Sequence, residues 1–211
     1  MENKQSIIEV ICGPMFAGKT DELLRRLNRA SYAKIQYLVF KPNTDTRTTN
    51  KIISRNNSER DAISINKSID ILEYLSKQKD IPHLIAIDEA QFLDTALYLV
   101  ANKLADMNIN VIVSGLDLDF RGEPFETIKN ILPYAERITK LTAVCTSCYN
   151  NANRSQRMTD NKVALTDDPV IVIGDIEKYS AKCRHCHILI KEPKNELEEK
   201  INNLINKIKE K

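Results

Sequence analysis

The sequence is poor in several features that mark specialised classes of protein. Its 211 residues include no tryptophan, aromatic residues make up 6%, and the net charge is only +2. A nearly neutral chain with few aromatics gives no reason to expect a nucleic-acid or membrane partner. No apolar run approaches the roughly 20 residues of a membrane-spanning helix. Residues 1–5 are polar and lack the apolar stretch of a signal peptide, so we expect a cytoplasmic protein.

Apolar segments alternate with amphipathic ones along most of the chain. We predict buried strands at 6–12, 35–40, 83–88 and 110–115, and helices at 21–27, 68–79, 94–107 and 125–132. This alternation is typical of an α/β domain built on a mostly parallel sheet. The long interval 41–61 is polar, and we predict an irregular loop there.

The pattern changes at Cys145, which suggests three units: a core at 1–144, a small module at 145–193 and a tail at 194–211. The module combines paired cysteines and polar stretches with one apolar run, 170–173, which predicts a short strand. The tail has apolar residues at helical spacing, so we predict an amphipathic helix. Docking on the body, docking on another subunit and a solvated tail are all compatible with this pattern, because an isolated helix of this length is marginal.

Glycine is scarce, yet residues 13–20 read Gly-Pro-Met-Phe-Ala-Gly-Lys-Thr, a full match to the phosphate-binding loop G-x-x-x-x-G-K-[ST]. A predicted strand precedes the motif and a predicted helix follows it, which is the context that the motif requires. In such a loop, backbone N–H groups form an anion nest at a helix start. The predicted phosphate-binding residues are Gly13, Pro14, Met15, Phe16, Ala17, Gly18, Lys19 and Thr20. Lys19 is expected to reach the β- and γ-phosphates, and the Thr20 hydroxyl to hold Mg²⁺.

Two acids end the predicted strand 83–88 and begin the next segment. An Asp at the carboxyl end of a buried strand next to the phosphate-loop strand can hold Mg²⁺ through water, which we predict for Asp88. Glu89 is the candidate general base, which takes a proton from an attacking hydroxyl. Because paired acids also cap helices, the competing interpretation of Glu89 is a solvated acid at a helix start.

Four of the five cysteines form two pairs: Cys145 with Cys148, and Cys183 with Cys186. Disulfides are not expected in the cytoplasm. Two Cys-x-x-Cys pairs therefore predict a tetrahedral, structural Zn²⁺ site that ties together the base of the intervening segment. The paired spacing favours Cys186 over the adjacent His187 as the fourth ligand. The competing interpretation is unpaired buried thiols, and Cys12 is interpreted as a small core residue.

Several motifs occur in a fixed order along the chain. Besides residues 13–20 and the cysteine pairs, they are Lys-Pro-Asn-Thr-Asp-Thr-Arg (41–47), Asp-Glu-Ala-Gln-Phe (88–92), Gly-Leu-Asp-Leu-Asp-Phe-Arg-Gly-Glu-Pro-Phe (115–125) and Val-Ile-Val-Ile-Gly (170–174) with Tyr179. This set resembles the cytosolic-type (type II) thymidine kinases across residues 5–190. The segment 115–125 and the cysteine pairs are far more specific than the phosphate loop alone.

The resemblance implies a RecA-like core and a zinc-anchored lasso at 145–193 that closes over a nucleoside. It implies transfer of the γ-phosphoryl group of ATP, bound with Mg²⁺, to the 5′-hydroxyl of thymidine, with Glu89 as the base. It also implies a homotetramer that is inhibited by thymidine triphosphate. By motif match, the thymidine-binding residues are Met15, Leu116, Phe120, Phe125, Val170, Ile171, Val172, Ile173 and Tyr179. For the ATP side of the site, the match adds Gln91, near the metal and the sugar, and Asp45 and Arg47, beside the phosphates.

Two other functions compete with this interpretation. A RecA-like ATPase acting on nucleic acid would be expected to carry a basic stripe and stacking aromatics, and the composition argues against both. A zinc-stapled interaction module with a vestigial phosphate loop is disfavoured because Lys19, Thr20, Asp88 and Glu89 are all present.

Overall fold

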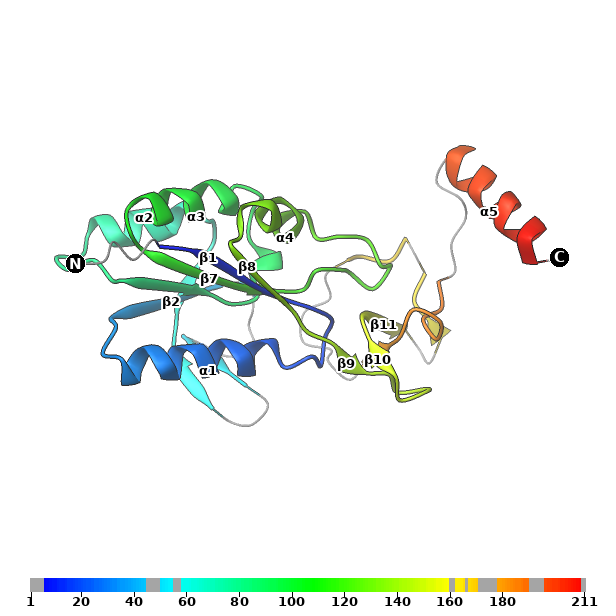
Figure 1. The fold of residues 1–211 in the computed structure, drawn as a ribbon, viewed down its shortest axis with the longest axis horizontal. Coiled ribbons are helices and arrows are strands. Elements are labelled where there is room, and N and C mark those ends of the chain that lie inside the picture. Colours follow the sequence, from blue (N-terminus) through cyan, green and yellow to red (C-terminus); the bar gives the residue numbers. More distant parts are fainter. Residues whose placement is uncertain are drawn as a thin grey trace.

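The computed structural model describes residues 6–44, 50–54, 58–159, 162–165, 167–170, 178–189 and 196–209. In this part of the chain, a central sheet is covered by helices on both faces. A small β module lies at one end of the sheet (Figure 1). The predicted α/β class with a parallel sheet is therefore confirmed.

Within the described residues, six strands form the central sheet. They are β1 (Ile8–Cys12), β2 (Tyr37–Pro42), β5 (Ile63–Ile65), β6 (Leu84–Ile87), β7 (Asn110–Gly115) and β8 (Arg137–Lys140), in the order β5-β2-β6-β7-β1-β8. All neighbouring strands are parallel, so their carboxyl ends meet at one edge. We predicted that the strand before Asp88 lies next to the phosphate-loop strand, and this was wrong. β7 pairs with both β6 and β1 and separates them.

Helices cover the two faces of the sheet (Figure 1). On one face, α1 (Lys19–Tyr32) packs through Leu23, Leu24, Leu27 and Ala30, whose spacing places them on one side of a helix. The other face carries α2 (Ile69–Ser76), α3 (Leu97–Asp106) and α4 (Glu126–Ile131), with the 3₁₀ turns η1 (Ala90–Phe92) and η2 (Leu132–Tyr134). The central strands are consequently buried on both sides, as their almost continuous apolar sequences require.

The interval 41–61 is more regular than its sequence suggested. β3 (Lys51–Ile53) and β4 (Glu59–Asp61) form an antiparallel ribbon, which corrects our prediction of an irregular loop. Ile52 of this ribbon is buried in the apolar cluster beneath α1. Strands of three residues are too short to show the alternation from which a strand is recognised.

The β module contains β9 (Ala143–Val144), β10 (Asn151–Ala152), β11 (Arg154–Thr159), β12 (Lys162–Val163) and β13 (Tyr179–Lys182). β11 pairs antiparallel with β12 and β13, and β9 pairs with β10. Our predicted strand, 170–173, is described only at Val170, which lies outside any strand. The longest strand of the module is instead the polar β11, whose side chains Ser155, Gln156 and Arg157 are buried.

The tail forms α5 (Glu196–Lys209), which Figure 1 shows beyond the β module. Its apolar residues remain exposed: Leu197, Ile201, Leu204, Ile205 and Ile208. A helix is thus present at 196–209 within the tail for which we predicted one, and its docking on the body or on another subunit stays a prediction. Of the helices in the described part, none is long and apolar enough to cross a membrane.

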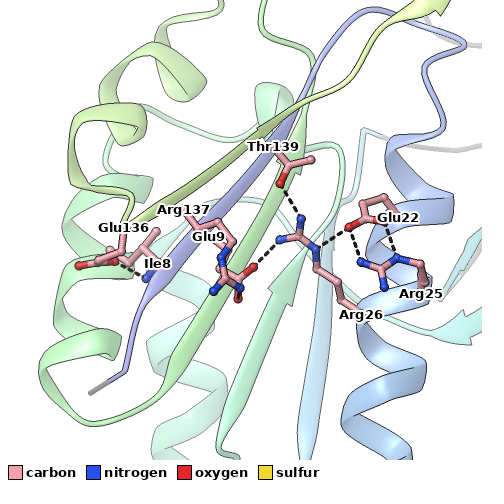
Figure 2. Close-up of polar contacts among 8 residues, drawn as sticks. All are labelled: Ile8, Glu9, Glu22, Arg25, Arg26, Glu136, Arg137 and Thr139. Carbon is pink, nitrogen blue, oxygen red and sulfur yellow. Dashed lines mark hydrogen bonds and ion pairs between the residues drawn. The ribbon is translucent and has the colours of Figure 1, made fainter. Parts of the chain in front are cut away.

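A network of charged side chains joins α1 to β1 and to the edge strand β8 (Figure 2). The Arg26 guanidinium contacts the carboxylate of Glu9, and it donates hydrogen bonds to Glu22 at 2.9 Å and to Thr139 at 2.7 Å. Arg137 bonds the other oxygen of Glu9 at 3.2 Å. Arg26 and Glu9 are only 12% and 15% exposed, so the pair is held largely away from water. The network therefore fixes the helix that begins with Lys19 against the sheet.

Replacing Arg26 by methionine should lower the free energy of unfolding. The change keeps the aliphatic stem but leaves the Glu9 carboxylate partly buried without its main partner. We expect a loss of about 2–3 kcal/mol, somewhat below the cost of breaking a fully buried pair, because Arg137 remains beside Glu9. Arg25→Met is the matched control, since Arg25 is 59% exposed and bonds only Glu22 in this network. Urea unfolding of both variants tests this, and equal shifts of the two midpoints would contradict it.

Candidate active site

The phosphate-loop motif lies between β1 and α1, as predicted. Gly13 has a φ of 147°, and a Cβ placed there would lie 2.5 Å from the carbonyl oxygen of Leu141, so a side chain is excluded. Gly18 has a φ of 77° in the left-handed region and directly precedes α1. The Lys19 ammonium donates a hydrogen bond to the carbonyl oxygen of Pro14 at 2.9 Å. The Lys19 side chain thus reaches back to the first half of its own loop, where a phosphate group would be held.

Asp88 lies at the end of β6 and is buried. One oxygen accepts hydrogen bonds from the Ser114 hydroxyl at 2.7 Å and from the Glu89 N–H at 3.0 Å. The other accepts from the Thr20 hydroxyl at 3.0 Å. Burial, and then the charge of Glu89, raise the pKa of Asp88 to about 6. Thr20 and Asp88 together offer the hard oxygen ligands that Mg²⁺ prefers, and a cation there would favour the charged carboxylate.

Glu89 occupies a strained position next to this cluster. Its φ of 50° is left-handed, which costs about 1–3 kcal/mol for a residue with a side chain. It precedes the 3₁₀ turn η1, as a helix-start acid would. However, its carboxylate is not simply solvated, because Oε2 accepts a hydrogen bond from the Gln91 amide at 2.5 Å.

Gln91 is itself fixed from the neighbouring strand. Its Oε1 accepts the N–H of Leu116 at 3.0 Å, immediately after β7. Gly115 makes this possible, since a Cβ there would lie 2.9 Å from the same oxygen. The position of the Glu89 carboxylate is therefore set by two strand ends, β6 and β7, and the inserted strand β7 has a direct part in it.

Apart from Met15 in the phosphate loop, the predicted nucleoside residues that the structure describes lie on the segment after β7 and on the β module. Phe120 is buried, and the Arg157 guanidinium stacks 3.8 Å from its ring centre. Arg157 also donates to the carbonyl oxygen of Pro169 at 2.5 Å and lies 3.4 Å from the Asp168 carboxylate. These contacts clamp Phe120 to the segment that leads into Val170.

The structure describes some of the remaining predicted residues and not others. Met15, Leu116, Val170 and Tyr179 are partly buried, and Tyr179 begins β13 directly opposite Arg157. Phe125 packs against the core cluster beneath α3 and α4. Five predicted residues lie outside the described part of the chain: Asp45, Arg47, Ile171, Val172 and Ile173.

Arg157 and Ser155 were missed by sequence reasoning. Both lie on β11, where Ser155 accepts the backbone N–H of Met15 at 3.0 Å. A strand whose buried positions are polar carries no hydrophobic alternation. No local signal in the sequence therefore marks either residue.

The four paired cysteines come together in the β module. Their sulfur atoms all lie within 4.8 Å of one another, and Sγ of Cys148 is 3.6 Å from Sγ of Cys183. That distance is far too long for a disulfide. It is close to the separation of roughly 3.8 Å expected for two sulfurs bound tetrahedrally to one zinc ion. The cluster could therefore hold a structural zinc.

The fourth sulfur belongs to Cys186, as the spacing favoured. The ring of His187 is engaged elsewhere, because its Nε2 lies 2.9 Å from the carbonyl oxygen of Phe120. The backbone N–H of Cys186 lowers the pKa of the Cys183 thiol, which favours the thiolate that binds metal. Both Cys-x-x-Cys turns close in the same way: the N–H groups of Tyr149 and His187 bond the carbonyls of Cys145 and Cys183.

The purified protein should contain about one zinc ion per chain. Cys186→Ser should lose most of this metal, whereas His187→Ala should retain it, because the histidine ring contacts Phe120 and not the sulfurs. Elemental mass spectrometry of the two variants measures the difference. Retention of zinc by Cys186→Ser together with its loss from His187→Ala would assign the fourth ligand to the histidine.

Comparison with known proteins tests the family resemblance that the motifs suggested. The model of the family described as thymidine kinase matches residues 6–187. A thymidine kinase of Mycoplasmoides gallisepticum is 49% identical over 190 residues, which are 90% of this chain and 84% of that protein. The resemblance inferred from the motifs is thus confirmed, and the chain belongs to the thymidine kinase family.

Proposed function

We propose that the protein is a thymidine kinase, which transfers the γ-phosphoryl group of ATP to the 5′-hydroxyl of thymidine with Glu89 as general base. The observation that carries this proposal is the joint position of Lys19, Thr20, Asp88 and Glu89 at the carboxyl edge of one parallel sheet. The product, thymidine monophosphate, would enter DNA synthesis by nucleoside salvage.

ATP binding is assigned to the loop 13–20. Its backbone N–H groups and the start of α1 supply positive potential for the β- and γ-phosphates. Phosphate would draw Lys19 from its bond to the Pro14 carbonyl, so the ammonium exchanges one oxygen partner for another. Thr20 and Asp88 would hold Mg²⁺, which when bound neutralises charge on the transferring group. Asp45 and Arg47 are proposed to act beside the phosphates on the strength of their motif alone.

Glu89 is suited to accept the proton of the 5′-hydroxyl. The bond from Gln91 fixes the position of its carboxylate. Phosphoryl transfer needs positioning and charge neutralisation more than covalent chemistry, so a fixed base next to the metal ligands is an appropriate arrangement. The buried Asp88 is unsuited to this task, because Ser114 and the Glu89 N–H both donate to one of its oxygens, and the other, bonded to Thr20, is assigned to Mg²⁺.

The nucleoside is assigned to the space between the 115–125 segment and the β module. Phe120, stacked under Arg157, offers an apolar wall, with Leu116, Phe125, Met15 and Tyr179 proposed to contribute. Backbone groups of Val170, Ile171, Val172 and Ile173 are proposed to read the pyrimidine edge. Such fixed polar groups discriminate strongly, because a mismatched base leaves them unpaired. Closure of the module over the acceptor would exclude water and so prevent hydrolysis of ATP.

Three further properties are proposed from the family resemblance. The protein is a homotetramer, thymidine triphosphate inhibits it, and it works in the cytoplasm. The cysteine cluster supports the last point, since free thiolates persist in a reducing compartment. Sedimentation analysis tests the first.

Glu89→Gln should lower kcat by about 10²–10⁴-fold, because the amide cannot accept the proton. Calorimetric binding of Mg·ATP should be unchanged, since the Glu89 side chain is not assigned to the phosphates. Glu126→Gln on the surface of α4 is the matched control and should retain full turnover. Half of the wild-type activity in Glu89→Gln would remove this residue from the proposed role.

The activity itself is tested with purified protein, Mg·ATP and each of the four deoxynucleosides. We expect 5′-monophosphate from thymidine in clear preference, and inhibition of the reaction by added thymidine triphosphate. A parallel reaction replaces the nucleosides by single-stranded DNA. ATP hydrolysis stimulated by the DNA, with no nucleoside phosphorylated, would instead support the nucleic-acid-dependent ATPase.

A further inference from the structure

The tip of the phosphate loop is packed against the cysteine cluster. Phe16 and Ala17 both contact a small buried group in the β module, which consists of Ala143, Cys145, Ala152, Ala181 and Cys183, with Cys186 at its border. The loop that is assigned to ATP and the cluster that could hold zinc therefore share one apolar contact, although 129 positions separate Phe16 from Cys145 in the chain.

The backbone at this contact is strained. Phe16 has a φ of 69°, in the left-handed region that residues with side chains seldom adopt. Such a conformation persists only where surrounding contacts impose it. At the neighbouring position, the N–H of Met15 is bonded to the Ser155 hydroxyl at 3.0 Å, so β11 holds the backbone of the loop as well. The loop is thus supported from outside at two successive residues.

The direction of the N–H groups in this loop decides how well it binds an anion. A nest of amides is effective only when those groups already converge before the phosphate arrives. If the loop spends part of its time in other conformations, the apparent dissociation constant rises in inverse proportion to the competent fraction. Contacts that hold Phe16 in place should therefore contribute to ATP affinity without touching ATP.

We propose that Phe16 is a positioning residue, through which the cysteine-stapled module holds the phosphate loop in its ATP-binding conformation. Metal in the module would then strengthen ATP binding itself, apart from any effect on the nucleoside. The inference rests on the proposed assignment of loop 13–20 to ATP.

The first experiment measures the dissociation constant of Mg·ATP by calorimetry, in the absence of thymidine. Phe16→Ala should bind ATP roughly tenfold more weakly, or worse, while it retains its zinc. Phe16→Leu keeps most of the apolar contact and should recover much of the affinity. Val144→Ala is the control from the same module, because Val144 is 63% exposed, and it should bind as the wild type does. Normal ATP affinity in zinc-loaded Phe16→Ala would overturn the proposal.

The second experiment combines this variant with removal of zinc by a chelator. In the wild type, loss of zinc should weaken ATP binding by a factor similar to that of Phe16→Ala. In the variant, loss of zinc should have little further effect, because the contact that transmits it is already gone. If removal of zinc raised the dissociation constant of ATP by the same factor in the wild type and in Phe16→Ala, zinc would act by another route. If it left the dissociation constant unchanged in both proteins, zinc would not act on the loop at all. Either result would contradict the proposal.

Two controls keep the outcomes distinct. Lys19→Ala should bind ATP far more weakly than the wild type, and wild-type affinity in this variant would contradict the assignment of the loop rather than the coupling to the module. If the zinc-free protein unfolds, amide hydrogen exchange of the zinc-loaded proteins decides. Faster exchange in residues 13–20 of Phe16→Ala, with β6 and β7 unchanged, supports the proposal, and unchanged exchange in the loop contradicts it.

Discussion

Strands that run parallel in one sheet must all end at the same edge, and the proposed chemistry of this protein depends on that constraint. β1 ends at the phosphate loop, β6 at Asp88 and Glu89, and β7 at the peptide that holds Gln91. No side chain has to reach far, because the backbone has already brought these groups together. The helices contribute by burying both faces, which keeps the strand ends in fixed relative positions.

The edge of the sheet forms one half of the proposed site, and we assign the other half to the β module. Arg157 joins Phe120 to the backbone at Pro169, and the ring of His187 holds the Phe120 carbonyl from another direction. The module has little apolar core of its own, so cross-linking by metal is a reasonable substitute for hydrophobic burial. Phe16 packs against the cysteine-containing group that such a metal would cross-link, so the two halves are in direct contact.

Motifs formed by residues that are adjacent in the sequence could be predicted. Features that depend on contacts between residues far apart in the sequence could not. The phosphate loop, the acids after β6 and the cysteine pairs are short motifs with fixed spacing, and the structure places each of them at a strand end or in one cluster. The insertion of β7 between β6 and β1 depends on the order of packing, which no local pattern encodes. β11 was missed because Ser155 and Arg157 are buried through polar contacts, and burial of that kind leaves no periodic signal.

The contact between Phe16 and the cysteines also has a consequence for the order in which the molecule forms. Protein synthesis delivers the chain from its amino end, and domains tend to fold in the sequence in which they emerge. β1 and α1 are made before the β module, yet the loop between them packs against Cys183 of that module. The loop is therefore made well before one of its packing partners, and a nascent chain that stops before the second cysteine pair carries the loop sequence without that contact.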